Sequence, residues 1–100
     1  MQTVAVLGLG YVGLPTAVVF AHRGYRVIGV DVGKVQAVNA GRSYLKEPGL
    51  GEMLKDSVAR GALSATTDAT AAVEQSDAVL ITVPTPVKTV LQTSPTYAKP

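Results

Sequence analysis

Apolar and polar positions along the chain alternate between short strand-like runs and longer stretches with helical spacing. Residues 3–7, TVAVL, form a short run rich in apolar and β-branched side chains, which is typical of a strand buried on both faces. Apolar side chains then recur at helical spacing between residues 12 and 23, and Gly24 follows where a left-handed C-terminal cap is favoured. We therefore expect a strand over 3–7 and a helix over 12–23.

The same alternation continues through most of the chain. Strands that alternate with helices predict an α/β fold, a Rossmann-type parallel sheet with right-handed crossovers and the strand order 3-2-1-4. The further expected elements are strands at 26–30, 63–66 and 78–83, and helices at 35–40, 50–60 and 68–75, the last capped by the carboxylate of Asp68.

The expected sheet is only partly built. Residues 78–83, AVLITV, are apolar except for Thr82, as in a central strand covered on both faces, yet nothing after them is predicted to pair with their outer edge. The segment after Pro86 shows no convincing periodicity. We expect residues 1–86 to form a partial Rossmann domain and residues 87–100 an irregular tail, with strands five and six and the rest of the protein missing.

Composition narrows the possible functions. The 100 residues form at most one small domain, and with 47% hydrophobic and 16% charged residues the chain should fold. A net charge of +2, without basic runs, gives no sign of nucleic-acid binding. The absence of cysteine and the single His22 leave no thiolate or histidine-cluster metal site. The sequence shows no signal peptide or membrane span, so we expect a cytoplasmic protein that binds no membrane.

The motif Gly8-Leu9-Gly10-Tyr11-Val12-Gly13 carries the candidate chemistry, because it leaves an expected strand and opens an expected helix. In such a turn Gly8 permits the tight bend, Gly10 lets a pyrophosphate approach the backbone, and Gly13 lets the helix pack closely. The free N–H groups at the helix start would then face the phosphates. This context predicts binding of a dinucleotide.

Asp31 indicates which dinucleotide. It lies 31 − 8 = 23 positions beyond Gly8, at the end of the second expected strand, where a carboxylate can accept hydrogen bonds from the adenosine ribose hydroxyls. A 2′-phosphate there would meet a like charge, so the predicted cofactor is NAD and not NADP. The alternative is a chance glycine turn with a solvated aspartate.

Four segments together resemble one enzyme family. GLGYVGLPTA, VIGVD, YLKEPGL and VPTPV, within residues 4–86, are similar to the N-terminal domain of the UDP-glucose/GDP-mannose dehydrogenase family, and most similar to its branch acting on UDP-N-acetylmannosamine or related UDP-N-acetylhexosamines. The resemblance implies backbone contacts from Tyr11 and Val12 to the pyrophosphate, Asp31 on the ribose, and Thr85 against the cofactor. Thr85 also follows the fourth expected strand, at the switch point where such sheets bind ligands; a rigid turn without ligand contact is the alternative.

The resemblance also implies a reaction that this chain cannot complete. Family members oxidise the C6 alcohol of a nucleotide sugar, such as a UDP-sugar, to a carboxylate in two hydride transfers to NAD, with a cysteine forming a covalent thiohemiacetal. This chain has no cysteine, so we assign no catalytic residue in it. We expect the nucleophile and the sugar pocket in the missing portion, and a homo-oligomeric full-length enzyme.

Some residues receive a structural interpretation. The stretch from Asp31 to Gly41 is about two residues shorter than the family pattern, so Lys34 is interpreted as a solvated lysine. His22 is expected to face solvent or the negative end of its helix, Glu47 to place the following helix, and the tyrosines at 25, 44 and 97 to serve packing.

A hypothesis from a different class is a regulatory module, in which the same fold senses NAD or ATP and transmits a conformational change. The incomplete sheet favours the enzyme, because a self-contained sensor should include the strands that cover its own edge.

Overall fold

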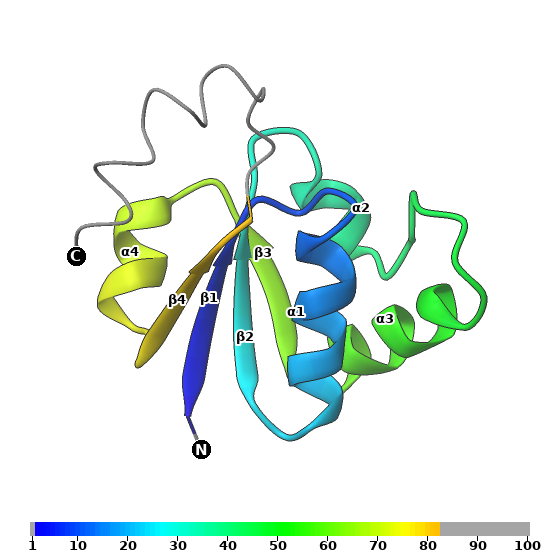
Figure 1. Cartoon of the computed structure of the whole chain (residues 1–100), viewed down its shortest axis with the longest axis horizontal. Helices are drawn as coiled ribbons and strands as arrows, with labels where there is room; N and C mark the ends of the chain where they lie inside the picture. Colours follow the sequence, from blue (N-terminus) through cyan, green and yellow to red (C-terminus); the bar gives the residue numbers. More distant parts are fainter. Residues whose placement is uncertain (1, 83–100) are drawn as a thin grey trace.

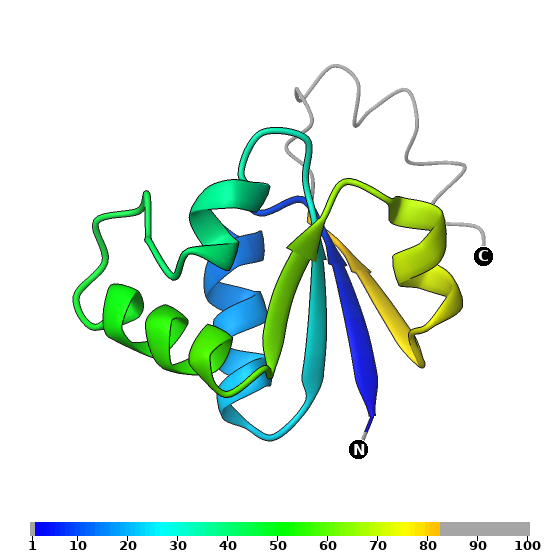
Figure 2. The same ribbon diagram turned by 180° about the vertical axis from the view of Figure 1, so that it is seen from behind.

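The computed structural model describes residues 2–82 and shows a parallel four-stranded sheet with helices on both faces (Figures 1 and 2). The strand order is β3-β2-β1-β4, which confirms the predicted order. The part of the expected last strand at Val83, and the expected tail, lie outside the described residues. The elements are β1 (Thr3–Leu7), α1 (Gly13–His22), β2 (Arg26–Val30), α2 (Val35–Asn39), α3 (Leu50–Ala59), β3 (Leu63–Thr66), α4 (Ala69–Glu74) and β4 (Ala78–Ile81).

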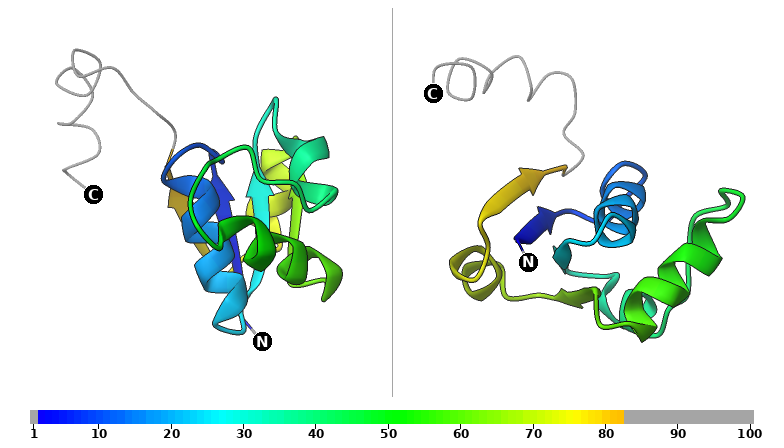
Figure 3. Two further views of the ribbon diagram at one scale, coloured as in Figure 1. Left: turned by 90° about the vertical axis from the view of Figure 1, so that its right-hand side faces the viewer. Right: turned by 90° about the horizontal axis from the view of Figure 1, so that it is seen from below.

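β1 lies between β2 and β4 and is the centre of the sheet. Val4 is in register with Val27 of β2 and with Ala78 of β4. Because side chains alternate between the two faces of a strand, Val4 and Val6 point to one face and Ala5 to the other. Seen from below, α1 and α3 lie on the first side of the sheet and α4 on the second (Figure 3, right).

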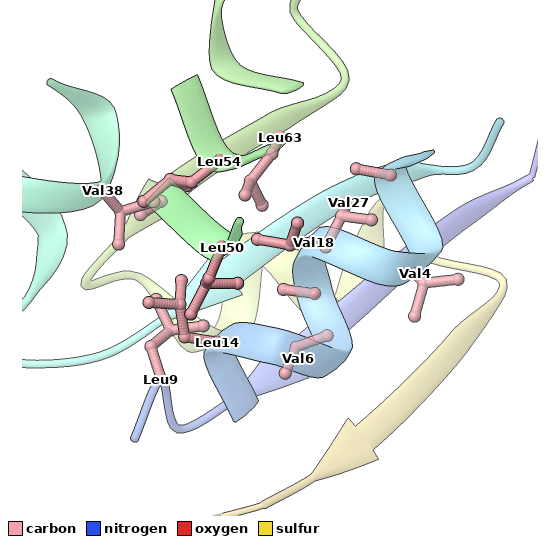
Figure 4. Packing of buried hydrophobic residues seen from close by; sticks show 13 residues of the cluster. Val4, Val6, Leu9, Leu14, Val18, Val27, Val38, Leu50, Leu54 and Leu63 are labelled. Atoms are coloured by element: carbon pink, nitrogen blue, oxygen red, sulfur yellow. The ribbon is translucent and has the colours of Figure 1, made fainter. Parts of the chain in front are cut away.

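The main hydrophobic core fills the space between the sheet and helices α1 and α3 (Figure 4). Leu14 and Val18 of α1 are fully buried there, as the helical spacing of apolar residues predicts. Leu54 of α3 and Leu63 of β3 extend the same core toward the edge of the sheet. This core fixes α1 against β1 and so fixes the loop that joins them.

The second face of the sheet has a much smaller core. Ala5 and Ile28 are buried there under Ala72 of α4. On β4 the side chains of Val79 and Ile81 remain 38% and 66% exposed. Of the described strands, only β1 pairs with β4, so within residues 2–82 β4 is an edge strand.

The structure confirms two predicted helix ends, the glycine after α1 and the aspartate cap before α4. Gly24 follows α1 with φ 98°, a left-handed conformation that costs glycine little because it has no Cβ. The Asp68 carboxylate accepts a hydrogen bond from the N–H of Ala71 at 3.0 Å and caps α4. Within the described part of the chain, no helix has the length and apolar character needed to cross a membrane.

Candidate functional site

The glycine motif forms the turn between β1 and α1. Gly8 has φ 97° and donates a backbone hydrogen bond to Val30 of β2 at 2.8 Å, so the turn begins in a conformation that favours glycine. A Cβ on Gly13 would lie 1.7 Å from the carbonyl oxygen of Gly8 and 2.4 Å from Oγ1 of Thr82. Gly13 therefore allows the start of α1 to lie directly on the turn and on the end of β4.

Gly10 is different, because the surrounding protein does not require a glycine there. A Cβ on Gly10 would meet no atom within 4 Å, and its φ is not in the left-handed range. Among residues 2–82, no group accepts a hydrogen bond from the backbone N–H of Gly10, Tyr11 or Val12, and α1 starts without a side-chain cap. Open space beside unbonded donors at a helix start suits an anion such as a phosphate.

Asp31 follows β2 and reaches back to the glycine motif. Its Oδ2 accepts a hydrogen bond from the N–H of Leu9 at 2.9 Å, and its Oδ1 accepts one from the N–H of Gly33 at 2.9 Å. Burial by itself raises the pKa of this carboxyl, but the N–H donors of Gly33 and Leu9 and the positive charge of Lys34 outweigh it, so the pKa is lowered. Asp31 is thus a carboxylate at neutral pH, with lone pairs left for a ligand.

An apolar cleft of about 300 Å³ opens beside Asp31 at the carboxyl ends of β1 and β2. A second cavity of about 310 Å³ shares Val32 and Thr67 with it. In parallel α/β sheets, ligands bind outside the carboxyl ends of the strands, which is where this cleft opens. The lining of the first cleft consists of Leu7, Gly8, Val30, Asp31, Val32, Thr67 and Ala69.

The structure brings six of the seven predicted site residues to this one edge. Gly8, Gly10, Tyr11, Val12 and Gly13 form the turn, and Asp31 lies against it. Tyr11 and Val12 are 83% and 64% exposed. Thr85 lies outside the described residues. Within residues 2–82, no cluster of three acidic or histidine side chains could hold a metal ion.

Two neighbours of the turn were not predicted from the sequence. The hydroxyl of Tyr44 donates a hydrogen bond to the carbonyl oxygen of Leu9, so the expectation that Tyr44 serves packing alone is wrong. Oγ1 of Thr82 donates to the carbonyl oxygen of Gly8 at 2.7 Å and ties the end of β4 to the turn. Thr82 is the one polar residue in the run AVLITV, and this could have indicated that its side chain has a specific partner.

Lys34 is exposed, as predicted, and it also has a neighbour that the sequence did not indicate. Its Nζ lies 4.8 Å from the centre of the Tyr44 ring. A cation at this distance is attracted by the face of an aromatic ring. Burial, together with the negative charge of Asp31, raises the pKa of Tyr44 to about 12. Asp31, Lys34 and Tyr44 therefore form one cluster beside Leu9.

The parallel sheet, the glycine turn and the acidic residue after β2 define a dinucleotide-binding protein of the Rossmann class. Comparison with known proteins makes this specific. Residues 2–99 match the NAD binding domain of the UDP-glucose/GDP-mannose dehydrogenase family, and the chain belongs to that family.

Individual relatives are nucleotide-sugar dehydrogenases. The chain is 49% identical over 88 residues to the UDP-N-acetyl-D-mannosamine dehydrogenase of Salmonella typhi, covering 86% of this chain and 20% of that protein. It is 47% identical over 87 residues to the NDP-N-acetyl-D-galactosaminuronic acid dehydrogenase of Ralstonia nicotianae, covering 85% of this chain and 20% of that protein.

A solved structure agrees with this assignment. The GDP-mannose dehydrogenase of Pseudomonas aeruginosa superimposes with a TM-score of 0.82 at 44% identity, over 86% of this chain and 20% of that chain. The chain thus spans about one fifth of the length of the relatives it matches.

Proposed function

We propose that this chain is the NAD-binding part of a longer dehydrogenase that oxidises the C6 alcohol of a UDP-sugar, specifically UDP-N-acetylmannosamine, to the uronic acid in two NAD-dependent steps. The observation that carries the proposal is the glycine turn with Asp31 bonded to it, in a chain of this family. The names of the two protein relatives from Salmonella typhi and Ralstonia nicotianae support the class of substrate, since both names contain an N-acetylated sugar nucleotide.

The residues on this edge fit the two charged and polar parts of NAD. The pyrophosphate would be received by the start of α1 and by the N–H groups of Gly10, Tyr11 and Val12, which have no acceptor among residues 2–82 and beside which Gly10 leaves space. The remaining lone pairs of the Asp31 carboxylate would accept hydrogen bonds from the ribose hydroxyls. Thr85 would complete the site on the side of β4.

The same residues set the choice of cofactor. NAD, when bound, supplies the acceptor for the hydride that leaves the sugar alcohol. The chain's part in that reaction is to bind and orient the dinucleotide. Because Asp31 is ionised and held in place by two backbone donors, a 2′-phosphate would be repelled there. We assign no proton transfer or covalent step to any residue of this chain.

The test is calorimetric titration of the full-length protein with NAD and with NADP. We expect the wild type to prefer NAD, and Asp31→Ala to weaken NAD binding by about 1–3 kcal/mol, the scale of losing charge-assisted hydrogen bonds. Asp31→Asn keeps an acceptor oxygen but loses the charge. It should therefore reduce the difference in affinity between NAD and NADP.

Asp56→Ala is the matched control, because Asp56 is an exposed carboxylate on α3 whose partner is Arg60, the residue that follows this helix. It should bind NAD as the wild type does. If the wild type binds NAD and NADP with equal affinity, Asp31 does not determine the choice of cofactor.

A further inference from the structure

Leu9, the residue between the first two glycines of the motif, is held on three sides. Its N–H donates to Oδ2 of Asp31 at 2.9 Å, and its carbonyl oxygen accepts the hydrogen bond from the Tyr44 hydroxyl. Its side chain is fully buried against Gly29, where an added Cβ would come within 2.8 Å of it. Residue 9 is therefore fixed by β2, by the loop after β2 and by the loop before α3.

The bond from Tyr44 matters for the next residue. The carbonyl of Leu9 and the N–H of Gly10 belong to one planar trans peptide, in which the two groups point in opposite directions. A donor that fixes the direction of the Leu9 carbonyl therefore also fixes the direction of the Gly10 N–H. Gly10 has no Cβ to restrict its backbone, and among residues 2–82 its N–H has no acceptor.

Tyr44 is itself held in place from two directions. Its ring is half-buried at the margin of the main core, and Nζ of Lys34 lies 4.8 Å from the ring centre. The neighbouring Ser43 hydroxyl donates to the carbonyl oxygen of Leu45 at 3.0 Å and accepts from its N–H at 3.1 Å, which fixes the backbone on both sides of Tyr44. The phenol therefore approaches Leu9 from an ordered segment.

We propose that Tyr44 is a positioning residue for the cofactor: its hydroxyl sets the Leu9–Gly10 peptide in the orientation that receives the pyrophosphate before the dinucleotide binds. Lys34 acts through Tyr44, because the contact of Nζ with the ring holds the phenol where its hydroxyl donates to Leu9. The inference deepens the proposed function and rests on it. Since the pKa of Tyr44 is raised to about 12, the hydroxyl keeps its proton and remains a donor across neutral and mildly alkaline pH.

The decisive variant is Tyr44→Phe in the full-length protein, because it removes the hydroxyl and keeps the ring. We expect the Kd for NAD to rise about 5- to 30-fold, the effect of losing one hydrogen bond that organises the site. Without NAD, amide hydrogen exchange of the glycine turn should become faster in the variant, because the Leu9–Gly10 peptide is no longer fixed. Unfolding in denaturant is measured alongside.

Tyr25→Phe is the matched control. Tyr25 is also half-buried and packs edge-on against Phe20 at a ring distance of 5.3 Å, away from the glycine motif, so the same chemical change should leave both NAD affinity and exchange unaltered. Lys34→Met gives an independent variant. It should weaken NAD binding in the wild-type background and have no further effect in Tyr44→Phe, because Lys34 then has no hydrogen bond to support.

Failure of the inference and failure of the proposed function give different results. If the wild type does not bind NAD, the proposed function fails. If the wild type binds NAD and Tyr44→Phe binds it equally tightly, only the inference fails. A Tyr44→Phe protein that is less stable but has unchanged exchange in the turn and unchanged NAD affinity would also overturn it, since Tyr44 would then serve the fold alone. If Lys34→Met weakens NAD binding equally in the wild type and in Tyr44→Phe, Lys34 does not act through Tyr44.

Discussion

At the scale of single residues, two glycines of the same motif are required for different reasons. Gly13 has no room for a side chain, because a Cβ would lie 1.7 Å from the carbonyl oxygen of Gly8. Within residues 2–82, Gly10 has open space around it and its φ is not in the left-handed range. The packing of the described residues therefore requires a glycine at Gly13, whereas at Gly10 it leaves the space that the proposed pyrophosphate site needs.

This difference predicts opposite behaviour of two variants. Gly13→Ala should destabilise the protein by several kcal/mol, on the order of 2–4, because the clash is with backbone that cannot move without separating α1 from the turn. Gly10→Val should stay folded and lose NAD binding, because the side chain would occupy the space for the pyrophosphate. Denaturant unfolding and calorimetric NAD titration of both variants measure the two effects. Retained NAD affinity in folded Gly10→Val would exclude the turn from the cofactor site.

At the scale of elements, the outer edge of β3 is covered by a single side chain. The Asn39 amide at the end of α2 donates to the carbonyl oxygen of Ala65 at 3.0 Å and accepts from its N–H at 2.9 Å. The amide thereby takes the place of a neighbouring strand for one residue of β3. Edge strands with unbonded N–H and C=O groups are prone to pair with other chains, so this contact also limits such pairing.

Replacing Asn39 with Ala should therefore destabilise the protein by about 1–3 kcal/mol, because it leaves two partly buried backbone groups of Ala65 without a partner. The free energy of unfolding from urea titration measures the loss. Gln36→Ala is the control, since Gln36 is exposed on the same helix and makes no side-chain hydrogen bond within residues 2–82. A loss no larger than that of the control would show that water replaces the amide without cost.

At the scale of the whole molecule, the two faces and two edges of the sheet differ. One face carries the large core under α1 and α3, and the other has a small core under α4. Asn39 occupies the backbone groups of Ala65 on the outer edge of β3, whereas within the described residues no group pairs with the outer edge of β4, and Ile81 is 66% exposed. Any association of the described part through its sheet is therefore expected at β4.

We expect the 100-residue chain, studied alone, to show no turnover of UDP-N-acetylmannosamine, because it has no cysteine for the covalent step. We also expect it to self-associate in a concentration-dependent way, because the outer edge of β4, unpaired within residues 2–82, is a template for another strand. NADH absorbance and sedimentation velocity measure the two properties. Ile81→Lys should shift sedimentation toward the monomer, while Lys55→Ala, which changes an exposed lysine on α3, should not. Measurable turnover, or a wild type that stays monomeric at all concentrations, would contradict this expectation.

Most of the fold could be predicted from the sequence because its signals are local. The runs that became β1 and β2, the helical spacing of α1 and the Asp68 cap each depend on residues a few positions apart. The strand order followed from the alternation of strands and helices, read as a Rossmann-type sheet with right-handed crossovers. The sequence also placed the glycine motif and Asp31 together, because each follows the carboxyl end of a strand and these ends lie side by side in a parallel sheet.

The tertiary structure alone decided which side chains support the glycine turn and the outer edge of β3. Tyr44 bonds to Leu9 across 35 positions, Thr82 to Gly8 across 74, and Asn39 to Ala65 across 26. No local pattern marks such pairs, because the partners meet only after the sheet has formed and the loops have been packed against it. The sequence by itself thus determined the elements, their order and the dinucleotide motif, while the packing of distant segments decided how that motif is held.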